Sequence, residues 1–191
     1  MFLNKILIFF LFVQSNFSLK FHNIKTIKLM YRKNDLNYDI YNNIYYDINH
    51  NILTAEHIFC KSFIKNYYNA HLDAHNIFLT SAYTNTYRSN YKYIDTKNID
   101  YVSKKKLNFI DSNNYRNTKN KLFLPCNYSR GIIARTIKYM LYNYDKLLLE
   151  DIIIDEETLE KWDINYPPTK FEIKKNELIN KFQGNKNIFI N

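Results

Sequence analysis

Three polar side chains in the first half of this chain could do chemistry together. Glu56 stands directly before His57, and Asn85 follows after a second apolar stretch. A carboxylate and an amide oxygen suit Mg²⁺, which prefers oxygen ligands and keeps several of its waters. A neutral imidazole can accept a proton from a water molecule near pH 7. This set would therefore permit metal-assisted hydrolysis of a phosphodiester, with His57 as the base and Glu56 and Asn85 as metal ligands.

A zinc site is the alternative for the same stretch. His57 and Cys60 form an H-x-x-C pattern, and His71 and His75 form an H-x-x-x-H pattern, which are spacings that zinc ligands often have. The chain is rich in Asn, His and Tyr, so chance placement explains this pattern better. A zinc site would also leave the carboxylate and the amide oxygen of the first set without a role.

The positions of these side chains depend on two strands and a helix. A turn at 49–51 leads into an extended stretch whose end carries Glu56 and His57. Neighbouring side chains of a strand face opposite sides, so both can serve one site only where the strand ends or bends. An apolar run at 77–80 predicts a second strand, and residues 82–93 have the spacing of a helix that carries Asn85. The expected local order is strand, strand, helix.

The composition indicates a single basic domain. A length of 191 residues fits one globular domain plus a leader, and 46% hydrophobic residues are enough for a core. A formal net charge of +9 and a pI near 9.3 indicate an acidic partner such as nucleic acid or an anionic membrane. The abundance of Lys, Asn, Ile and Tyr is also what an AT-rich coding sequence produces. A solvated basic face therefore explains the charge equally well.

The first 46 residues are interpreted as a leader and a connector. Residues 1–18 combine a short basic start, an apolar run and a small-residue end, which is typical of a secretory signal peptide; a core helix is the alternative. The apolar run is shorter than the roughly 20 residues that span a bilayer. Residues 19–34 are basic and carry no acid, as in organelle transit peptides, so a two-part leader into a plastid and an ordinary linker both fit. Residues 35–46 are interpreted as a connector, which places the folded domain at 47–191.

The second half begins with a polar segment and a core helix. Residues 101–120 are basic and polar, and we expect a loop there, with a short strand at 107–110 as an option. A solvated loop and a contact with nucleic acid both fit this composition. Apolar residues at helical spacing then predict a helix that runs to Tyr144, with Ser129 as its N-cap. Arg130 and Arg135 fall in its first turns, where a positive charge is mildly unfavourable because of the helix dipole. Either a phosphate partner or a local ion pair would explain these two arginines.

Two more helices are expected toward the C-terminus. One opens at 155–157 and is stopped by Pro167-Pro168. The last begins with a capping box, Thr169-x-x-Glu172, and ends at Gly184. Phe182 is expected on its buried face. Capping is the role predicted for Glu172.

Several motifs, in this order, resemble the endonuclease I family over roughly residues 47–191, and the last of them is the most specific. They are Glu56-His57-Ile58-Phe59 with Ser62; Asp73-Ala74-His75-Asn76-Ile77 running to Asn85 and Arg88-Ser89-Asn90; Arg130-Gly131-Ile132-Ile133-Ala134-Arg135; and Trp162 with Pro167, followed by Glu172, Asn176 and Gln183-Gly184-Asn185-Lys186-Asn187.

The resemblance implies an α+β fold, with a ββα-metal nuclease core and appended C-terminal helices. It implies that His57 is the general base and that Glu56 and Asn85 hold Mg²⁺ or another divalent cation. Members of the family cut DNA and often RNA with little sequence preference and leave 5′-phosphates, so we expect partners bound through the phosphate backbone. The supporting residues around the site are Asp73, His75 and Asn76, and the phosphate-binding candidates are Arg88, Arg130, Arg135 and Lys61.

The chain also departs from the family in ways that bear on activity. Between His57 and Arg88 it has no arginine, where bacterial members carry a phosphate-clamping arginine, and Lys61 does not reproduce bidentate binding. The disulfides of some members have no counterpart, and one bridge between Cys60 and Cys126 stays open as an expectation.

A catalytically inactive nucleic-acid-binding protein that kept the fold is the alternative function. The retained base and both metal ligands argue against it. We expect a monomer without a membrane partner in the mature chain. The leader predicts entry into the secretory pathway, followed by secretion or delivery to an organelle.

Overall fold

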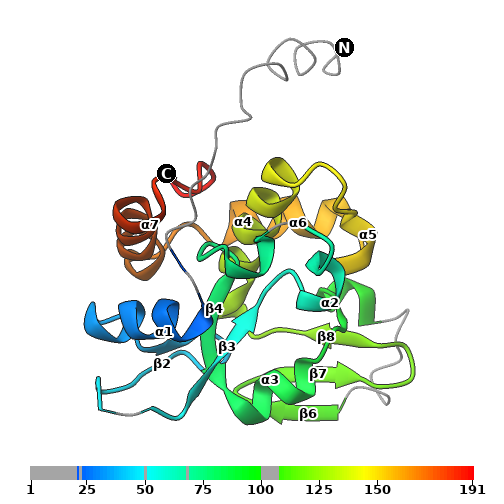
Figure 1. Cartoon of the computed structure of the whole chain (residues 1–191). Helices are drawn as coiled ribbons and strands as arrows, with labels where there is room; N and C mark the ends of the chain where they lie inside the picture. The colour runs from blue at the N-terminus through cyan, green and yellow to red at the C-terminus, as the bar shows by residue number, and fades with distance from the viewer. Residues whose placement is uncertain (1–20, 22, 50, 68, 100–107) are drawn as a thin grey trace.

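The computed structural model of this chain is an α+β fold built from two small sheets with helices beside and above them (Figure 1). It describes residues 21, 23–49, 51–67, 69–99 and 108–191. The predicted fold class is confirmed. The signal peptide predicted at 1–18 lies outside the described residues.

The first sheet has the strand order β2-β1-β4-β3. Its strands are β1 (Tyr38–Asp39), β2 (Ile44–Tyr45), β3 (Leu53–His57) and β4 (Ile77–Ser81). β3 and β4 are antiparallel and place Glu56 opposite Phe78 and His57 opposite Ile77. β1 runs parallel to β4. β4 is buried from Ile77 through Thr80, so the hairpin that carries Glu56 and His57 stands on the apolar core.

Residues 24–46 belong to this folded unit, which differs from the leader and connector expected there. Helix α1 (Ile24–Lys33) begins at Asn23, whose side chain accepts a hydrogen bond from the Thr26 backbone N–H at 3.0 Å. It buries Ile27 and Tyr31 on its inner face, while Lys25 and Lys33 are exposed. The basic composition that suggested a transit peptide therefore reflects the outer face of an amphipathic helix.

The second sheet has the order β5-β8-β7-β6. Its strands are β5 (Lys92–Tyr93), β6 (Asn108–Asp111), β7 (Asn114–Asn117) and β8 (Leu122–Leu124). Two of them fall within the segment 101–120: β6 agrees with the short strand considered at 107–110, and β7 shows that the loop prediction was wrong at 114–117. Ser112 and Asn113 both have positive φ, 40° and 66°, which is the backbone of a tight turn between hairpin strands.

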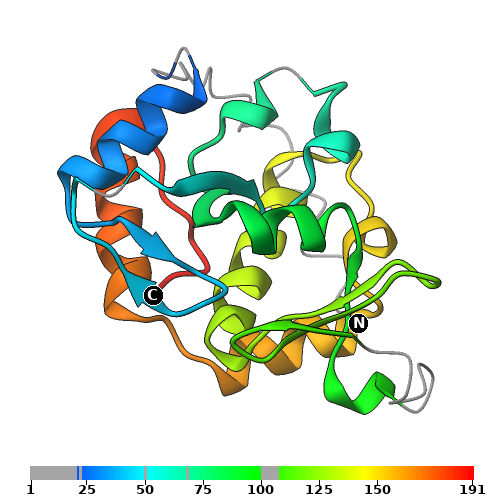
Figure 2. The same cartoon turned by 90° about the horizontal axis from the view of Figure 1, so that it is seen from below.

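Helix α3 (Ala82–Arg88) lies between the two sheets (Figures 1 and 2). It contacts β3 and β4 of the first sheet and β6 of the second. The connection from β3 to β4 holds two short helices, α2 (Lys61–Ile64) and the 3₁₀ helix η1 (Ala70–Leu72). A second 3₁₀ helix, η2 (Thr96–Ile99), follows β5.

Helix α4 (Asn127–Asn143) is the core helix. It is buried on all sides from Ser129 to Ile137, which is typical of a helix at the centre of a domain. It begins two residues before the predicted N-cap, and Ser129 instead donates its hydroxyl to the Ile40 carbonyl at 2.8 Å. A Cβ on Gly131 would lie 2.2 Å from the Tyr166 carbonyl oxygen, so this close approach requires glycine.

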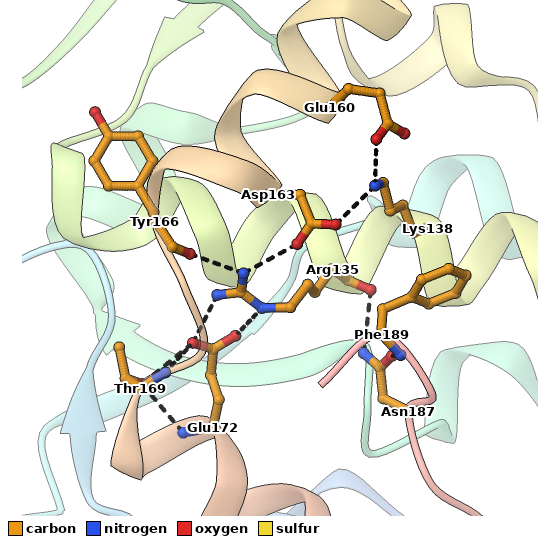
Figure 3. Close-up of polar contacts among 9 residues, drawn as sticks. All are labelled: Arg135, Lys138, Glu160, Asp163, Tyr166, Thr169, Glu172, Asn187 and Phe189. Carbon is orange, nitrogen blue, oxygen red and sulfur yellow. Dashed lines mark hydrogen bonds and ion pairs between the residues drawn. The ribbon is translucent and has the colours of Figure 1, made fainter. Parts of the chain in front are cut away.

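The C-terminal helices lie above the sheets in the view of Figure 1. They are α5 (Leu149–Ile152), α6 (Glu156–Asn165) and α7 (Lys170–Gln183). The capping box between Thr169 and Glu172 is confirmed (Figure 3), and α7 ends at Gly184, whose φ is 90°. Phe182, expected on the buried face, is 43% exposed.

Two further features of the described residues concern membrane-spanning helices and disulfide bonds. No helix in the described part of the chain is long and apolar enough to cross a membrane. Cys60 and Cys126 are free and buried, and burial raises the pKa of both thiols. The disulfide considered between Cys60 and Cys126 is therefore not formed in this structure.

Candidate active site

The predicted order of strand, strand and helix is present in β3, β4 and α3. β4 passes into α3 without a loop because the Ser81 side chain accepts a hydrogen bond from the Thr84 backbone N–H at 3.1 Å, which caps the helix. β3 ends at His57, the point at which two neighbouring side chains can converge. α3 is shorter than the predicted 82–93, since Ser89 adopts a φ of 53° and ends the helix.

Glu56 is a buried carboxylate, 2% exposed. Its Oε1 accepts a hydrogen bond from the Tyr41 hydroxyl at 2.9 Å and lies 3.3 Å from Arg88 Nε. That Nε makes no hydrogen bond, so the contact with Arg88 is an ion pair only. Burial raises the pKa of Glu56, and the Arg88 charge, the Tyr41 hydroxyl and a hydrogen bond from the His57 backbone offset only part of the increase. The negative charge of this carboxylate is therefore only partly compensated by its neighbours, and a further positive charge would stabilise it.

Arg88 faces the interior and is 1% exposed. Its Nη2 donates to the Ile58 carbonyl at 2.6 Å and its Nη1 to the Ser89 carbonyl at 2.9 Å, and Nη1 also contacts Cys60 Sγ. The guanidinium lies over the Tyr93 ring, 4.6 Å from its centroid. All of these partners are internal. A phosphate could reach Arg88 only by displacing one of them.

His57 is held through one ring nitrogen. Its Nε2 lies 2.9 Å from the His71 carbonyl oxygen. A carbonyl oxygen can only accept, so Nε2 carries the proton and Nδ1 is the nitrogen that can accept one. Burial lowers the pKa of His57; the bond to His71 opposes this, while the charges of Lys61 and Arg88 act with burial. The ring is thus a neutral imidazole with its basic nitrogen defined.

Asn85 is anchored to the strand that carries Glu56. Its Nδ2 donates to Thr54 Oγ1 and to the Ala55 carbonyl, both at 3.0 Å. Two acceptors at one end of the amide settle which atom is the nitrogen. The other atom, Oδ1, is therefore the oxygen. Both hydrogen bonds are made by Nδ2, so the lone pairs of Oδ1 remain available.

These oxygens fit a hard divalent cation. Both side-chain contacts of Glu56 fall on Oε1, so Oε2 has lone pairs for a metal, and Asn85 supplies Oδ1. Mg²⁺ is commonly held by one or two protein oxygens plus water and phosphate oxygens. In the described residues no three His, Cys, Asp or Glu side chains converge on a common point, so the zinc alternative finds no ligand set there.

The three supporting residues lie in the return from η1 to β4. Asn76 pairs with the Phe59 backbone through both ends of its amide, at 2.7 and 3.0 Å, and so fixes the chain just after His57. Asp73 accepts hydrogen bonds from two tyrosine hydroxyls of α4 and its C-cap. Burial lowers the pKa of His75 to about 4, and its Nε2–H donates to the Asn185 carbonyl at 3.2 Å. Together they hold the segment that contains His71.

The remaining phosphate candidates divide into buried and exposed. Arg130 is paired with Asp95 at 3.0 Å. Arg135 makes two hydrogen bonds to Glu172 (Figure 3). Of the two explanations open for these arginines, the ion pair is the one the structure displays. Lys61 is exposed, and its charge contributes to lowering the pKa of His57.

Two tyrosines of the site were missed from the sequence. Tyr41 donates to Glu56, and its hydroxyl lies 2.8 Å from that of Tyr93, so Tyr93 is the donor in that second bond. Tyr41 lies in the stretch interpreted as a connector. With 18 tyrosines in the chain, no local signal separates these two from the others.

The chain was compared with known proteins. A model of the endonuclease I family, described as "Endonuclease I", matches residues 8–191. An "Extracellular deoxyribonuclease" of Aeromonas hydrophila is 30% identical over 118 residues, which cover 62% of this chain and 48% of that protein. A "Periplasmic deoxyribonuclease" of the same species is 31% identical over 118 residues, 62% of this chain and 46% of that protein.

A third relative matches a shorter region. "Endonuclease-1" of Buchnera aphidicola subsp. Acyrthosiphon pisum (strain APS) is 36% identical over 72 residues, 38% of this chain and 28% of that protein. In each case the matched region spans less than half of the relative's length.

Proposed function

This chain belongs to the endonuclease I family, and from that premise we propose that it is a divalent-metal-dependent nuclease that hydrolyses phosphodiester bonds of DNA. The single observation that carries the proposal is the hydrogen bond from His57 Nε2 to the His71 carbonyl. It leaves Nδ1 as a proton acceptor on β3, the strand that also carries Glu56. Asn85 is held against the same strand by its hydrogen bonds to Thr54 and Ala55. The names of the two Aeromonas deoxyribonucleases support DNA as the substrate.

His57 performs the proton transfer in this proposal. Its Nδ1 takes a proton from a water molecule as that water attacks phosphorus in line, and the proton then passes to solvent. The His71 carbonyl stabilises the imidazolium that forms, since it accepts the Nε2–H. Glu56 Oε2 and Asn85 Oδ1 would hold the divalent cation, which would supply positive charge near the 3′-oxygen. The bond between phosphorus and that oxygen breaks, and the 3′-oxygen takes a proton from solvent. The product keeps a 5′-phosphate.

Substrate contact in this proposal is made through the backbone. Arg88 is engaged by internal partners, so we assign the phosphate contact to Lys61, an exposed cation whose charge lowers the pKa of His57. Lysine acts as a point charge, which recognises phosphate without reading sequence. Cleavage of DNA, and of RNA by the same chemistry, should therefore show little sequence preference and weaken with salt.

The names of the relatives also support secretion. Both Aeromonas proteins are named for locations outside the cytoplasm, and this chain begins with the predicted signal peptide. α1 contributes Ile27 and Tyr31 to the core, so a leader that is removed must end before that helix. We propose a secreted monomer.

The experiment is plasmid nicking by the purified chain with Mg²⁺, with EDTA, and with two histidine variants. His57→Ala should lower the rate by roughly 10²–10⁴, the usual contribution of a general base. His71→Ala is the matched control, because it keeps the backbone carbonyl that orients His57 and should stay near the wild-type rate. Retained DNA binding with no nicking in any condition would instead support the inactive binding protein.

A further inference from the structure

Gln183, the last residue of α7, is bonded to the return segment between η1 and β4, 109 positions away in the chain. Its Oε1 accepts a hydrogen bond from the Ala74 backbone N–H at 3.0 Å. Its Nε2 donates to Asp73 Oδ1 at 2.9 Å. One buried amide thus engages two consecutive residues through both of its ends, which restrains the position and the rotation of that segment.

The carboxylate bonded by Gln183 is saturated by other donors. Asp73 Oδ2 accepts the hydroxyls of Tyr139 and Tyr144, both at 2.9 Å, and Oδ1 also accepts the His75 backbone N–H at 3.0 Å. Removal of one donor from a buried polar network costs more than an average hydrogen bond. Residues 73–74 therefore have one defined position relative to α4 and α7.

That position is transmitted to the catalytic histidine through one turn of backbone. Asp73 directly follows η1, and its backbone N–H donates to the Ala70 carbonyl at 3.3 Å, which closes the turn. The middle residue of η1 is His71, whose carbonyl accepts the Nε2–H of His57. A shift of residues 73–74 would move this carbonyl with them.

We propose that Gln183 is a positioning residue for His57. It holds residues 73–74 against α7, and so keeps the His71 carbonyl at the place where it selects the Nε2–H tautomer and presents Nδ1 to the attacking water. The proposal rests on the proposed function in assigning His57 as the base. The tautomer itself is a property of the folded chain without metal or substrate, so it can be measured separately.

The test compares two equally buried amides of α7. Gln183→Met keeps the side-chain volume and removes both contacts to the return segment. Asn176→Met is the matched control: Asn176 bonds the Asn187 backbone N–H and carbonyl, at 2.8 and 3.0 Å, and makes no contact that leads to η1. Both variants lose a two-ended amide contact. Only the first should affect His57.

Two readouts are needed. Long-range ¹H–¹⁵N spectra of ¹⁵N-histidine-labelled chain report the tautomer of His57 at a pH where the ring is neutral. We expect the Nε2–H form in the wild type and in Asn176→Met, and a mixture of both tautomers in Gln183→Met. Steady-state nicking with Mg²⁺ should show kcat of Gln183→Met reduced about tenfold, since small misplacement of a catalytic group is costly, with KM nearly unchanged.

The outcomes separate the two proposals. If Gln183→Met keeps the wild-type tautomer and kcat and loses only stability, as Asn176→Met does, Gln183 is a structural residue and the inference is wrong. If the tautomer changes in Gln183→Met but no chain nicks DNA, the positioning role stands and the proposed function fails. Should Gln183→Met not fold, Tyr144→Phe removes one hydroxyl from Asp73 at a half-buried position and is read in the same way.

Discussion

Two arginine–glutamate pairs are buried in the part of the chain that the structure describes, and they are built in opposite ways. Arg135 and Glu172 share two hydrogen bonds of 2.8 and 2.9 Å, and Glu172 also accepts the Thr169 backbone N–H in the capping box (Figure 3). Arg88 and Glu56 make one contact of 3.3 Å that is not a hydrogen bond. The first carboxylate is saturated with donors, whereas the second is not.

The difference in hydrogen bonding distinguishes a pair that joins helices from a pair that lies at the candidate active site. A buried charge pair is stable only when hydrogen bonds satisfy the remaining lone pairs. At Glu172 they do, and the pair joins α4 to α7. At Glu56 burial still raises the pKa of the carboxyl in spite of Arg88 and Tyr41. A carboxylate left in this condition gains from a further cation, so the incomplete pair is the one placed beside His57.

The largest effect we predict is a loss of stability on breaking the saturated pair. Glu172→Gln removes the more buried of the two carboxylates that pair with Arg135, leaves only Asp163, and should lower the free energy of unfolding by about 3 kcal/mol. Glu56→Gln keeps an acceptor for the Tyr41 hydroxyl and breaks no hydrogen bond of Arg88, whose guanidinium keeps its carbonyl acceptors, so it should lower the free energy of unfolding by only about 1 kcal/mol. Urea unfolding in EDTA measures both values. Equal losses would show that the two pairs contribute alike and would remove the distinction.

The next effect is a gain on adding metal. A ligand that binds only the folded state at ten times its Kd raises the free energy of unfolding by about 1.4 kcal/mol. Wild type and Glu172→Gln should both show this gain with Mg²⁺, and Glu56→Gln should show none. Urea unfolding with and without Mg²⁺, at matched ionic strength, measures it. An undiminished gain in Glu56→Gln would place the cation elsewhere.

Local patterns in the sequence were enough to predict the framework of the site. Glu56-His57 at a strand end, Asn85 on the following helix and the capping box at Thr169 all depend on residues within a few positions of one another. The partners that tune the site come from distant segments: Tyr41 reaches Glu56, and Gln183 reaches residues 73–74. Such contacts are a product of packing, and spacing in the chain carries no information on them.

Composition was the weakest guide, for a physical reason. A run of lysines without acids is shared by transit peptides and by the outer face of an amphipathic helix, and only the burial of Ile27 and Tyr31 distinguishes the second. The same holds for Arg88 and Arg135, which look available to phosphate in the sequence. A charge count cannot reveal that the structure surrounds them with internal acceptors.

Another buried cation, Lys175, extends the comparison, because its hydrogen bonds go to backbone carbonyls and it forms no ion pair with a carboxylate of the described residues. Lys175 donates to the carbonyls of Ala74 and His75, at 2.9 and 3.4 Å, and its Nζ lies 3.6 Å from the centroid of the Phe78 ring. Burial lowers the pKa of Lys175 to about 7, although the charges of Asp73 and Glu172 act to raise it. Without a bonded carboxylate, burial prevails.

The smallest effect we predict is a pH dependence that follows from this lysine. Its pKa is about 7 folded and about 10.5 unfolded, so between these values the unfolded chain binds more protons and stability rises with pH. The free energy of unfolding should rise by about 1 kcal/mol per pH unit between about pH 7.5 and 9. Below about pH 7 the amine is charged in the folded and the unfolded chain alike, so this pH dependence ends there.

Lys175→Met should lack this slope, and urea unfolding at several pH values measures the difference between the two chains. The other titrating groups do not obscure it. His75, with a pKa of about 4, is neutral throughout this range, and the buried thiols of Cys60 and Cys126 titrate alike in both chains. Parallel curves would show that the Lys175 amine is charged when folded, and therefore that carbonyl oxygens and aromatic rings can replace the carboxylate that Arg88 and Arg135 each have.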